Sequence, residues 1–339
     1  MKDTDPIHAW LNSPIPETLW HYTSIGGFQG ITTSREIYAT DSRFLNDREE
    51  IVHARTIAKD LIEEYPEADP EQPGRRRLAN LVISDIFSPT GMFSPNSLLS
   101  YVSSFSTAAD SLSQWRGYSK GSSGACLGFK MNRPRQQILE FDVNWLHETQ
   151  KKGYPACFAP CVYDHSKKKE LLRQALSRVL AAFKEIFSEL PEVRAMFNDS
   201  KPGGRFLVEA SQFLVGAKFS PSIERFRDAL LQTIGDLLNI APLLKNVAFK
   251  EENEWRLVIW SSAGAGNPQH PLRFRAGDTS LVPYIAYPHG SGEDMQIDLS
   301  DVLLGPGSDE HGLSVAQSFL KSIGLNLKVG NSSAPFRRT

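Results

Sequence analysis

The segment from Glu252 to Arg256 places two carboxylates and a guanidinium within an otherwise apolar stretch. It belongs to Phe249-Lys-Glu-Glu-Asn-Glu-Trp-Arg-Leu-Val-Ile-Trp260, whose β-branched and aromatic second half predicts a strand. Because side chains alternate between the faces of a strand, Glu252, Glu254 and Arg256 would share one face. Charges on one face of an apolar strand are costly to bury without a partner or a ligand. By itself this pattern favours a solvated sheet rim, and a functional site needs support from other residues.

That support comes from polar side chains that lie within aromatic or apolar stretches. They are His21 in Leu19-Trp-His-Tyr-Thr-Ser24, Ser104 and Ser106 in Ser103-Ser-Phe-Ser106, and Trp115, Arg116 and Tyr118 in Gln114-Trp-Arg-Gly-Tyr-Ser119. Each of them alone indicates a hydrogen-bonded core residue more often than a catalyst. Their occurrence together with the Glu pair favours a common site.

Read together, these segments resemble an uncharacterised bacterial family of proteins with a domain of unknown function. The resemblance runs from about residue 19 to 337 and is carried by His21-Tyr-Thr-Ser24, Ser42-Arg-Phe-Leu-Asn-Asp47, Ser104-Phe-Ser106, Trp115-Arg-Gly-Tyr118, Leu127-Gly-Phe129, Glu252-x-Glu-Trp-Arg256 and Gly305-Pro306. It implies a family but no activity.

A more remote resemblance implies an activity. Leu19-Trp-His-Tyr-Thr-Ser24 is similar to the aromatic-His-Gly-Thr strand of ADP-ribosyltransferases. Ser104-Phe-Ser106 and Glu252-Asn-Glu254 resemble the Ser-x-Ser and Glu-x-Glu motifs of the arginine-type branch. The chain departs from that superfamily at Tyr22, where Gly is usual, and it combines a His-type first strand with a Glu-x-Glu motif.

The second resemblance implies an enzyme that uses NAD as a substrate. It would transfer ADP-ribose to a macromolecule, protein or nucleic acid, or hydrolyse NAD, and the class includes bacterial toxins and antiphage effectors. Cleavage of the ribose–nicotinamide bond passes through an oxocarbenium-like state, which a carboxylate at the ribose 2′-hydroxyl stabilises. Glu254 would take this role, Glu252 would position or deprotonate the acceptor, and His21 would bind the adenosine ribose.

The same resemblance implies a set of residues that bind NAD. Tyr118 or Trp115 would stack on nicotinamide, and Arg43 or Arg116 would pair with the pyrophosphate. The competing structural interpretations are core packing for the two aromatic residues and an ion pair of Arg43 with Asp47 or Glu50. The complete set comprises His21, Tyr22, Thr23, Arg43, Ser104, Ser106, Trp115, Arg116 and Tyr118.

Two other functions remain open at this point. His21, Arg43 and the Glu pair could serve a metal-independent nuclease through acid–base and phosphate-binding roles. The same residues could also line the pocket of a non-catalytic module that senses a nucleotide. Nicotinamide release, RNA cleavage and binding without turnover distinguish the three functions.

Composition and length describe an ordinary globular chain. It has 339 residues, of which 40% are hydrophobic and 22% charged, with a net charge of -2. This charge argues against a predominantly basic surface for nucleic acid. The first residues lack the apolar core of a signal peptide, and no stretch approaches the roughly 18–20 apolar residues of a membrane span. We therefore expect a cytoplasmic protein without a membrane partner.

The three cysteines do not predict a metal site. Cys157 and Cys161 form one close pair and Cys126 stands apart, whereas a structural zinc site normally takes two close pairs. We expect no metal, and an odd number of cysteines fits a reducing compartment.

The apolar patterns predict an α+β fold. Period-two or β-branched stretches predict strands at 18–24, from 36, and at 101–106, 125–129, 138–143, 159–163, 249–260, 272–275, 282–287, 297–304 and 325–329. Helices are expected at 7–11, 47–64 with Asp47 as N-cap, 77–87 and 311–323, with one turn at 25–31.

Residues 166–245 have a different pattern from the rest of the chain. Apolar residues recur there at three- and four-residue spacing over 171–187, 206–219 and 223–238, which is typical of amphipathic helices. We interpret 166–245 as a helical insertion between two halves of a core, residues 1–165 and 246–339. Combined with the second resemblance, the expected fold is an ADP-ribosyltransferase-like, split and mostly antiparallel β core with peripheral helices.

Overall fold

A computed structural model gives the structure of the chain. It describes residues 5–45, 50–67, 74–87, 98–118, 124–132, 155–189, 191, 195, 197–198, 220–262, 271–277, 279–290 and 297–335. The expected strand at 138–143, the helix at 206–219 and the N-cap at Asp47 lie outside these residues.

The described strands form one mixed sheet of ten strands. Its main path runs β10-β9-β4-β1-β3-β2-β8-β7, and β6 and β5 extend it from the other edge of β3. All pairs are antiparallel except β9 with β10. The strands are β1 (Thr18–Ser24), β2 (Glu36–Asp41), β3 (Leu98–Ser106), β4 (Gly124–Lys130), β5 (Ala156–Pro160), β6 (Glu254–Ser262), β7 (Arg273–Ala276), β8 (Leu281–Pro288), β9 (Asp298–Leu304) and β10 (Lys328–Asn331).

The sheet divides at β3. One edge of β3 pairs with β6 along its whole length, from Leu98 opposite Ser262 to Ser106 opposite Glu254. The other edge is shared, because β1 pairs with it at Ser106 and β2 pairs with it at residues 101 and 102. Strands β1 and β2 therefore leave β3 at different points, and residues 103–105 lie between them.

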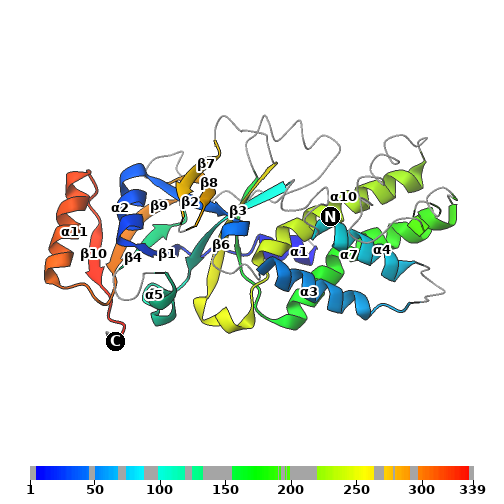
Figure 1. Cartoon of the computed structure of the whole chain (residues 1–339), viewed down its shortest axis with the longest axis horizontal. Coiled ribbons are helices and arrows are strands. Elements are labelled where there is room, and N and C mark those ends of the chain that lie inside the picture. Colours follow the sequence, from blue (N-terminus) through cyan, green and yellow to red (C-terminus); the bar gives the residue numbers. More distant parts are fainter. Residues whose placement is uncertain are drawn as a thin grey trace.

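Helices cover the sheet in two groups, which Figure 1 shows toward opposite ends of the molecule. The first group packs with β5 and β6 around one apolar core. The second group, α2 and α11, covers a separate apolar core on the other side of the sheet. The first group consists of α1 (Pro6–Leu11), α3 (Glu50–Glu63), α4 (Arg75–Ile86), α7 (His165–Glu189) and α10 (Pro221–Ile240), and the second of α2 (Ile25–Ser34) and α11 (Glu310–Ser322).

The mixed α/β architecture and the mostly antiparallel sheet confirm the coarse prediction of the fold. Helices α7 and α10 cover the stretches 171–187 and 223–238, as the apolar spacing predicted. They share their core with α3 and α4, which come from an earlier part of the chain. None of the helices in the described ranges is long and apolar enough to span a bilayer.

The structure corrects two local predictions. Residues Val247–Glu252 form a 3-10 helix, η4, and the strand begins only at Glu254. Asn253 separates the two with a left-handed backbone conformation (φ 43°), which Asn tolerates better than most residues. The expected turn at 25–31 is a ten-residue helix, α2, because the Ser24 hydroxyl accepts a hydrogen bond from the Gly27 amide and caps it.

Strand β6 lies inside the sheet and not at a solvated rim. Leu257 and Ile259 pack into the core beneath α2, and Val258 and Trp260 pack into the helical core on the opposite face. At the start of the same strand Glu254 is only 3% exposed. The interpretation of the Glu pair as solvated rim residues is therefore wrong for Glu254.

Candidate functional site

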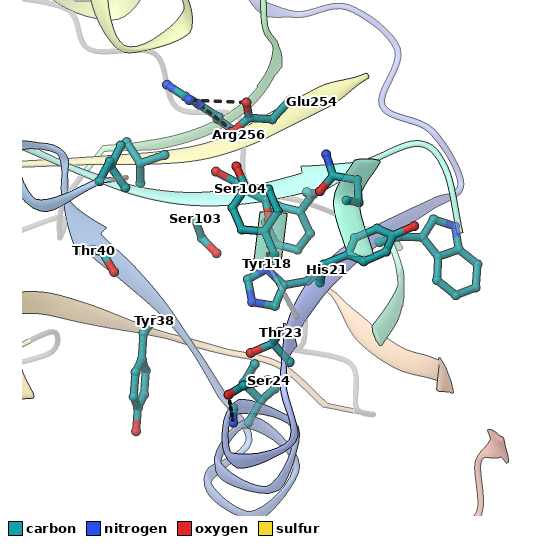
Figure 2. Close-up of a pocket in the computed structure, with 18 of the residues that line it drawn as sticks. His21, Thr23, Ser24, Tyr38, Thr40, Ser103, Ser104, Tyr118, Glu254 and Arg256 are labelled. Atoms are coloured by element: carbon teal, nitrogen blue, oxygen red, sulfur yellow. Dashed lines mark hydrogen bonds and ion pairs between the residues drawn. The ribbon is translucent and has the colours of Figure 1, made fainter. Parts of the chain in front are cut away.

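A cavity of about 660 Å³ opens where β1 and β2 separate from β3. Figure 2 shows side chains from β1, β2, β3 and β6 around it, with Tyr118 from α5 (Leu112–Tyr118). Its volume lies within the range of roughly 300–1,000 Å³ that is usual for small-molecule sites. The lining residues that matter below are His21, Thr23, Ser24, Gly27, Tyr38, Thr40, Ser104, Gln114, Tyr118, Lys245, Glu252, Glu254, Arg256 and Arg275.

The cavity brings together seven of the residues that the sequence singled out. Strand β1 supplies three of them, β3 one and α5 one, while the two glutamates come from η4 and β6. These residues are His21, Tyr22, Thr23, Ser104, Tyr118, Glu252 and Glu254. Four others do not line the cavity, namely Arg43, Ser106, Trp115 and Arg116.

His21 is held in one tautomer by the backbone of β3. Its Nδ1 lies 2.8 Å from the carbonyl oxygen of Ser104. Because a carbonyl oxygen can only accept, Nδ1 carries the proton and Nε2 keeps a lone pair. Burial lowers the pKa of His21, and the hydrogen bond to Ser104 opposes this only in part. The imidazole is therefore neutral at pH 7 and presents Nε2 as an acceptor.

Glu254 lies between two cations in the interior. Arg256 donates from Nε to Oε1 at 2.8 Å, and Lys245 donates to Oε2. Lys245 and Arg256 are themselves only 3% and 2% exposed. Burial alone would raise the pKa of Glu254, but attraction to Arg256 and Lys245 outweighs it and lowers the pKa to about 2. The carboxylate is ionised throughout the physiological range.

Glu252 has a different environment although it is only two residues away. Its carboxylate also accepts from Lys245, and its side chain is 14% exposed. Burial raises the pKa of Glu252, and Lys245 offsets this only in part. The two glutamates therefore differ, because Glu254 is a permanent anion and Glu252 takes up a proton more readily.

Tyr118 supplies a protonated phenol to the same cluster. Burial and the nearby charge of Glu254 raise its pKa. The hydroxyl is thus protonated at neutral pH and can donate a hydrogen bond.

The four predicted residues outside the cavity have structural partners or are exposed. Arg43 donates from Nη2 to Asp41 at 2.7 Å. Asp47 and the side chain of Glu50, its expected partners in the structural interpretation, lie outside what the structure describes. Trp115 is fully buried and its indole donates to Asp110. Ser106 donates to the carbonyl of Glu252 at 2.8 Å, and Arg116 is exposed.

Tyr22 lines the cavity but is anchored beneath it. Its hydroxyl donates to the carbonyl of Ala108 and accepts from the amide of Ser111, each at 2.8 Å. Its ring meets Trp115 edge to face with centroids 4.8 Å apart. The side chain therefore fixes the loop before α5, and with it the position of Tyr118.

Sequence reasoning missed Lys245, Arg275, Tyr38 and Gln114. Lys245 lies at the end of the predicted helical insertion, and Arg275 lies on a strand whose pattern is unremarkable. No motif includes either residue. Arg275 reaches the cavity through the pairing of β7 with β8 and of β8 with β2, and Lys245 through the short connection that leads from Leu244 into η4. Among the described residues, no group of three or more His, Cys, Asp or Glu side chains could hold a metal ion.

The arrangement combines a fixed anion, a second carboxyl group of higher pKa, a neutral imidazole and a phenol donor around one cavity. Such a set can bind the hydroxyl groups of a sugar and stabilise positive charge that develops near Glu254. It can also remove a proton from an attacking group through Glu252.

The comparisons with known proteins reach the family and no further. Residues 114–257 match a family described as Protein of unknown function (DUF2971). This confirms the first resemblance, to an uncharacterised family with a domain of unknown function, over that part of the chain. The match includes Tyr118, Lys245 and both glutamates. No curated protein and no solved structure matches the chain significantly.

Proposed function

Starting from a chain whose residues 114–257 match the model of a family of unknown function, we propose that it is an NAD-consuming enzyme of the ADP-ribosyltransferase type. One observation supports this most strongly. His21 and Glu254, which are more than 200 residues apart in the sequence, line the same cavity of about 660 Å³. Ser104 and Tyr118 line it with them.

The residues of the cavity fit a dinucleotide. Nε2 of His21 is placed to accept from a ribose hydroxyl, and the phenol of Tyr118 offers a donor and an aromatic face. When bound, NAD supplies a glycosidic bond whose cleavage leaves positive charge on the ribose.

Glu254 is the group that stabilises this charge. Arg256 and Lys245 occupy part of its acceptor capacity, but an ionised carboxylate offers about four lone-pair sites. A ribose hydroxyl can therefore donate to Glu254 without breaking either ion pair. Because the cations keep the pKa of Glu254 at about 2, the negative charge is present before the substrate binds.

Glu252 is the group that accepts a proton from the attacking hydroxyl or water. It is nearer to solvent than Glu254 and its pKa is raised. A carboxylate with a higher pKa is the stronger base, which suits this role.

A second candidate function is a non-catalytic module that senses a nucleotide. The observation that favours it is the double ion pair of Glu254 with Lys245 and Arg256. The two cations offset the negative charge of the carboxylate, which leaves it less able to stabilise a developing positive charge. In this case the cavity binds the nucleotide and releases it unchanged.

Nicotinamide release from NAD tests the proposal. We expect turnover by the wild-type protein and a decrease of about 10²–10³-fold in kcat for Glu254→Gln. Glu251→Gln is the matched control, because Glu251 is an exposed neighbour in η4. Thermal unfolding of both variants establishes that they are folded.

Labelled RNA in a parallel reaction completes the test. Strand scission without nicotinamide release would favour the nuclease instead. NAD binding without release, unchanged in Glu254→Gln, would favour the sensing module. Either result would overturn the enzyme proposed above.

A further inference from the structure

Arg275 differs from the other cations of the cavity. Lys245 and Arg256 are both ion-paired with Glu254. Within the described ranges Arg275 has no carboxylate partner, and its one polar contact is with the Thr40 hydroxyl, 3.4 Å from Nη2. A guanidinium that lines a cavity without a carboxylate partner is suited to an anion.

The neighbouring arginine on the same strand shows the contrast. Arg273, two residues before Arg275, donates from Nη1 to Glu36 at 2.6 Å. It does not line the cavity. The two arginines are two residues apart on one strand and so point to the same face of it. Arg275 is the one of the two that lines the cavity and has no carboxylate partner in the described ranges.

An aromatic surface lies on the same wall. Tyr38 of β2 lines the cavity and stacks on Tyr284 of β8, with ring centroids 4.1 Å apart and an interplanar angle of 27°. Tyr284 is 8% exposed, so Tyr38 is the ring of this pair that faces the open space. A ring supported from behind provides a rigid surface for a planar base.

This wall is separate from the charged cluster. Figure 2 shows Tyr38 and Thr40 on one side of the cavity and Glu254 with Arg256 on another, with His21 between them. A ligand that reaches both sides has an anionic and planar part at Tyr38 and a neutral or cationic part at Glu254.

We propose that Arg275 binds the phosphates of a nucleoside diphosphate whose base stacks on Tyr38. This inference rests on the proposed function in one respect, since the ADP half of NAD would then lie at Arg275 and the nicotinamide ribose at Glu254. It gives Arg275 the role that the sequence assigned to Arg43 or Arg116.

Calorimetric titration with ADP and with adenosine tests the inference. The two ligands share base and ribose and differ only in the phosphates. We expect Arg275→Met to weaken ADP binding about 10- to 100-fold, as for the loss of charge-assisted hydrogen bonds. Adenosine binding should change less than about twofold, because the group that it lacks is the one that Arg275 contacts. Arg273→Met is the matched control and should keep wild-type affinity for ADP.

The outcomes separate this inference from the proposed function. If ADP binds through Arg275 but wild-type protein releases no nicotinamide, the diphosphate site stands and the enzyme does not. If nicotinamide is released and Arg275→Met binds ADP and NAD as wild type does, the enzyme stands and the diphosphate site is refuted. Wild-type protein that binds ADP no better than adenosine, or binds neither, also refutes the diphosphate site.

Discussion

The Nδ1 of His21 donates to the carbonyl oxygen of Ser104 across 2.8 Å, at the point where β1 has left β3. On this edge of β3 none of the described strands lies opposite Ser104, because β1 has diverged there. The His21 side chain therefore supplies the hydrogen bond to the Ser104 carbonyl that a neighbouring strand would otherwise supply. The same divergence opens the cavity. The hydrogen bond therefore satisfies the Ser104 carbonyl of β3 and fixes the imidazole at the cavity wall.

Replacement of His21 by Phe tests this relationship. Phe keeps the ring contact with Phe105, whose centroid lies 5.6 Å from that of the imidazole, but it cannot donate to Ser104. A buried carbonyl without a donor costs about 1–3 kcal/mol. Because the Ser104 carbonyl is only half-buried, we expect a loss at the lower end of this range, about 1 kcal/mol, in the free energy of unfolding from urea titration. The exposed His311 offers a control, His311→Gln, with no measurable change. Equal stabilities of His21→Phe and wild type would contradict the structural role.

Replacement of Lys245 by Met tests the charged cluster. The change leaves Glu252 and Glu254 close together with one cation fewer, and disruption of a buried ion pair typically costs about 3–5 kcal/mol. Adding Glu252→Gln should recover part of this loss, because it removes one of the two carboxylates that Lys245 contacts. Lys250→Met, at an exposed position in η4, should have little effect. A Lys245→Met variant as stable as wild type would show that the cluster does not need this cation.

The pH dependence of stability should reflect His289. Burial lowers its pKa to about 4 from an ordinary value of 6.5, and among the described residues its Nδ1 has no hydrogen-bond partner. Below pH 6.5 the unfolded chain takes up a proton at this residue and the native protein does not, so stability is lost as the pH falls from 6.5 to 4. The expected loss is about 3 kcal/mol.

His289→Gln isolates this contribution. Gln can still donate to the carbonyl of Ile31, which Nε2 of His289 contacts at 3.2 Å, but it does not titrate. Urea unfolding at several pH values should give a shallower slope for the variant than for wild type between pH 6.5 and 4. Other titrating groups are common to both proteins and cancel in the difference. Parallel curves would mean that His289 takes up a proton in the folded protein as readily as in the unfolded chain.

The elements with a strong apolar period were predictable from the sequence. Strands β1, β3 and β4 and helices α7 and α10 form where the spacing placed them. The start of β6 was not predictable, because the left-handed conformation of Asn253 interrupts an otherwise strand-like pattern. Single-residue backbone conformations of this kind have no periodic signature.

Parts of the candidate site were predictable only where residues belong to motifs. His21, Tyr118 and Glu254 stand out because they are polar residues in apolar or aromatic stretches. Arg275 does not stand out in the sequence. It reaches the cavity because β7 pairs with β8 and β8 pairs with β2. Arg43 belongs to a motif but does not line the cavity. Its partner Asp41 is two residues away and satisfies its charge locally.

Gly27 and Thr23 provide a test of the cavity wall at the start of α2. A Cβ at position 27 would lie 1.9 Å from Oγ1 of Thr23, so Gly27→Ala forces the threonine side chain or the first turn of the helix to move. Overpacking of this kind typically costs about 1–3 kcal/mol. We expect a corresponding decrease in the free energy of unfolding, together with weaker binding of any ligand that contacts the β1–α2 junction.

Thr23→Ala should rescue this variant, because it removes the hydroxyl that the new methyl group meets. The double variant Gly27→Ala/Thr23→Ala is therefore expected to be more stable than the two single variants predict when their effects are added, as for two residues in contact. Gly30→Ala is the matched control in the same helix. A Cβ there has nothing within 4 Å, so the higher helix propensity of Ala should raise stability by up to about 1 kcal/mol. If Gly27→Ala behaves like Gly30→Ala, the close approach of Thr23 to α2 is refuted, and with it the shape of this end of the cavity.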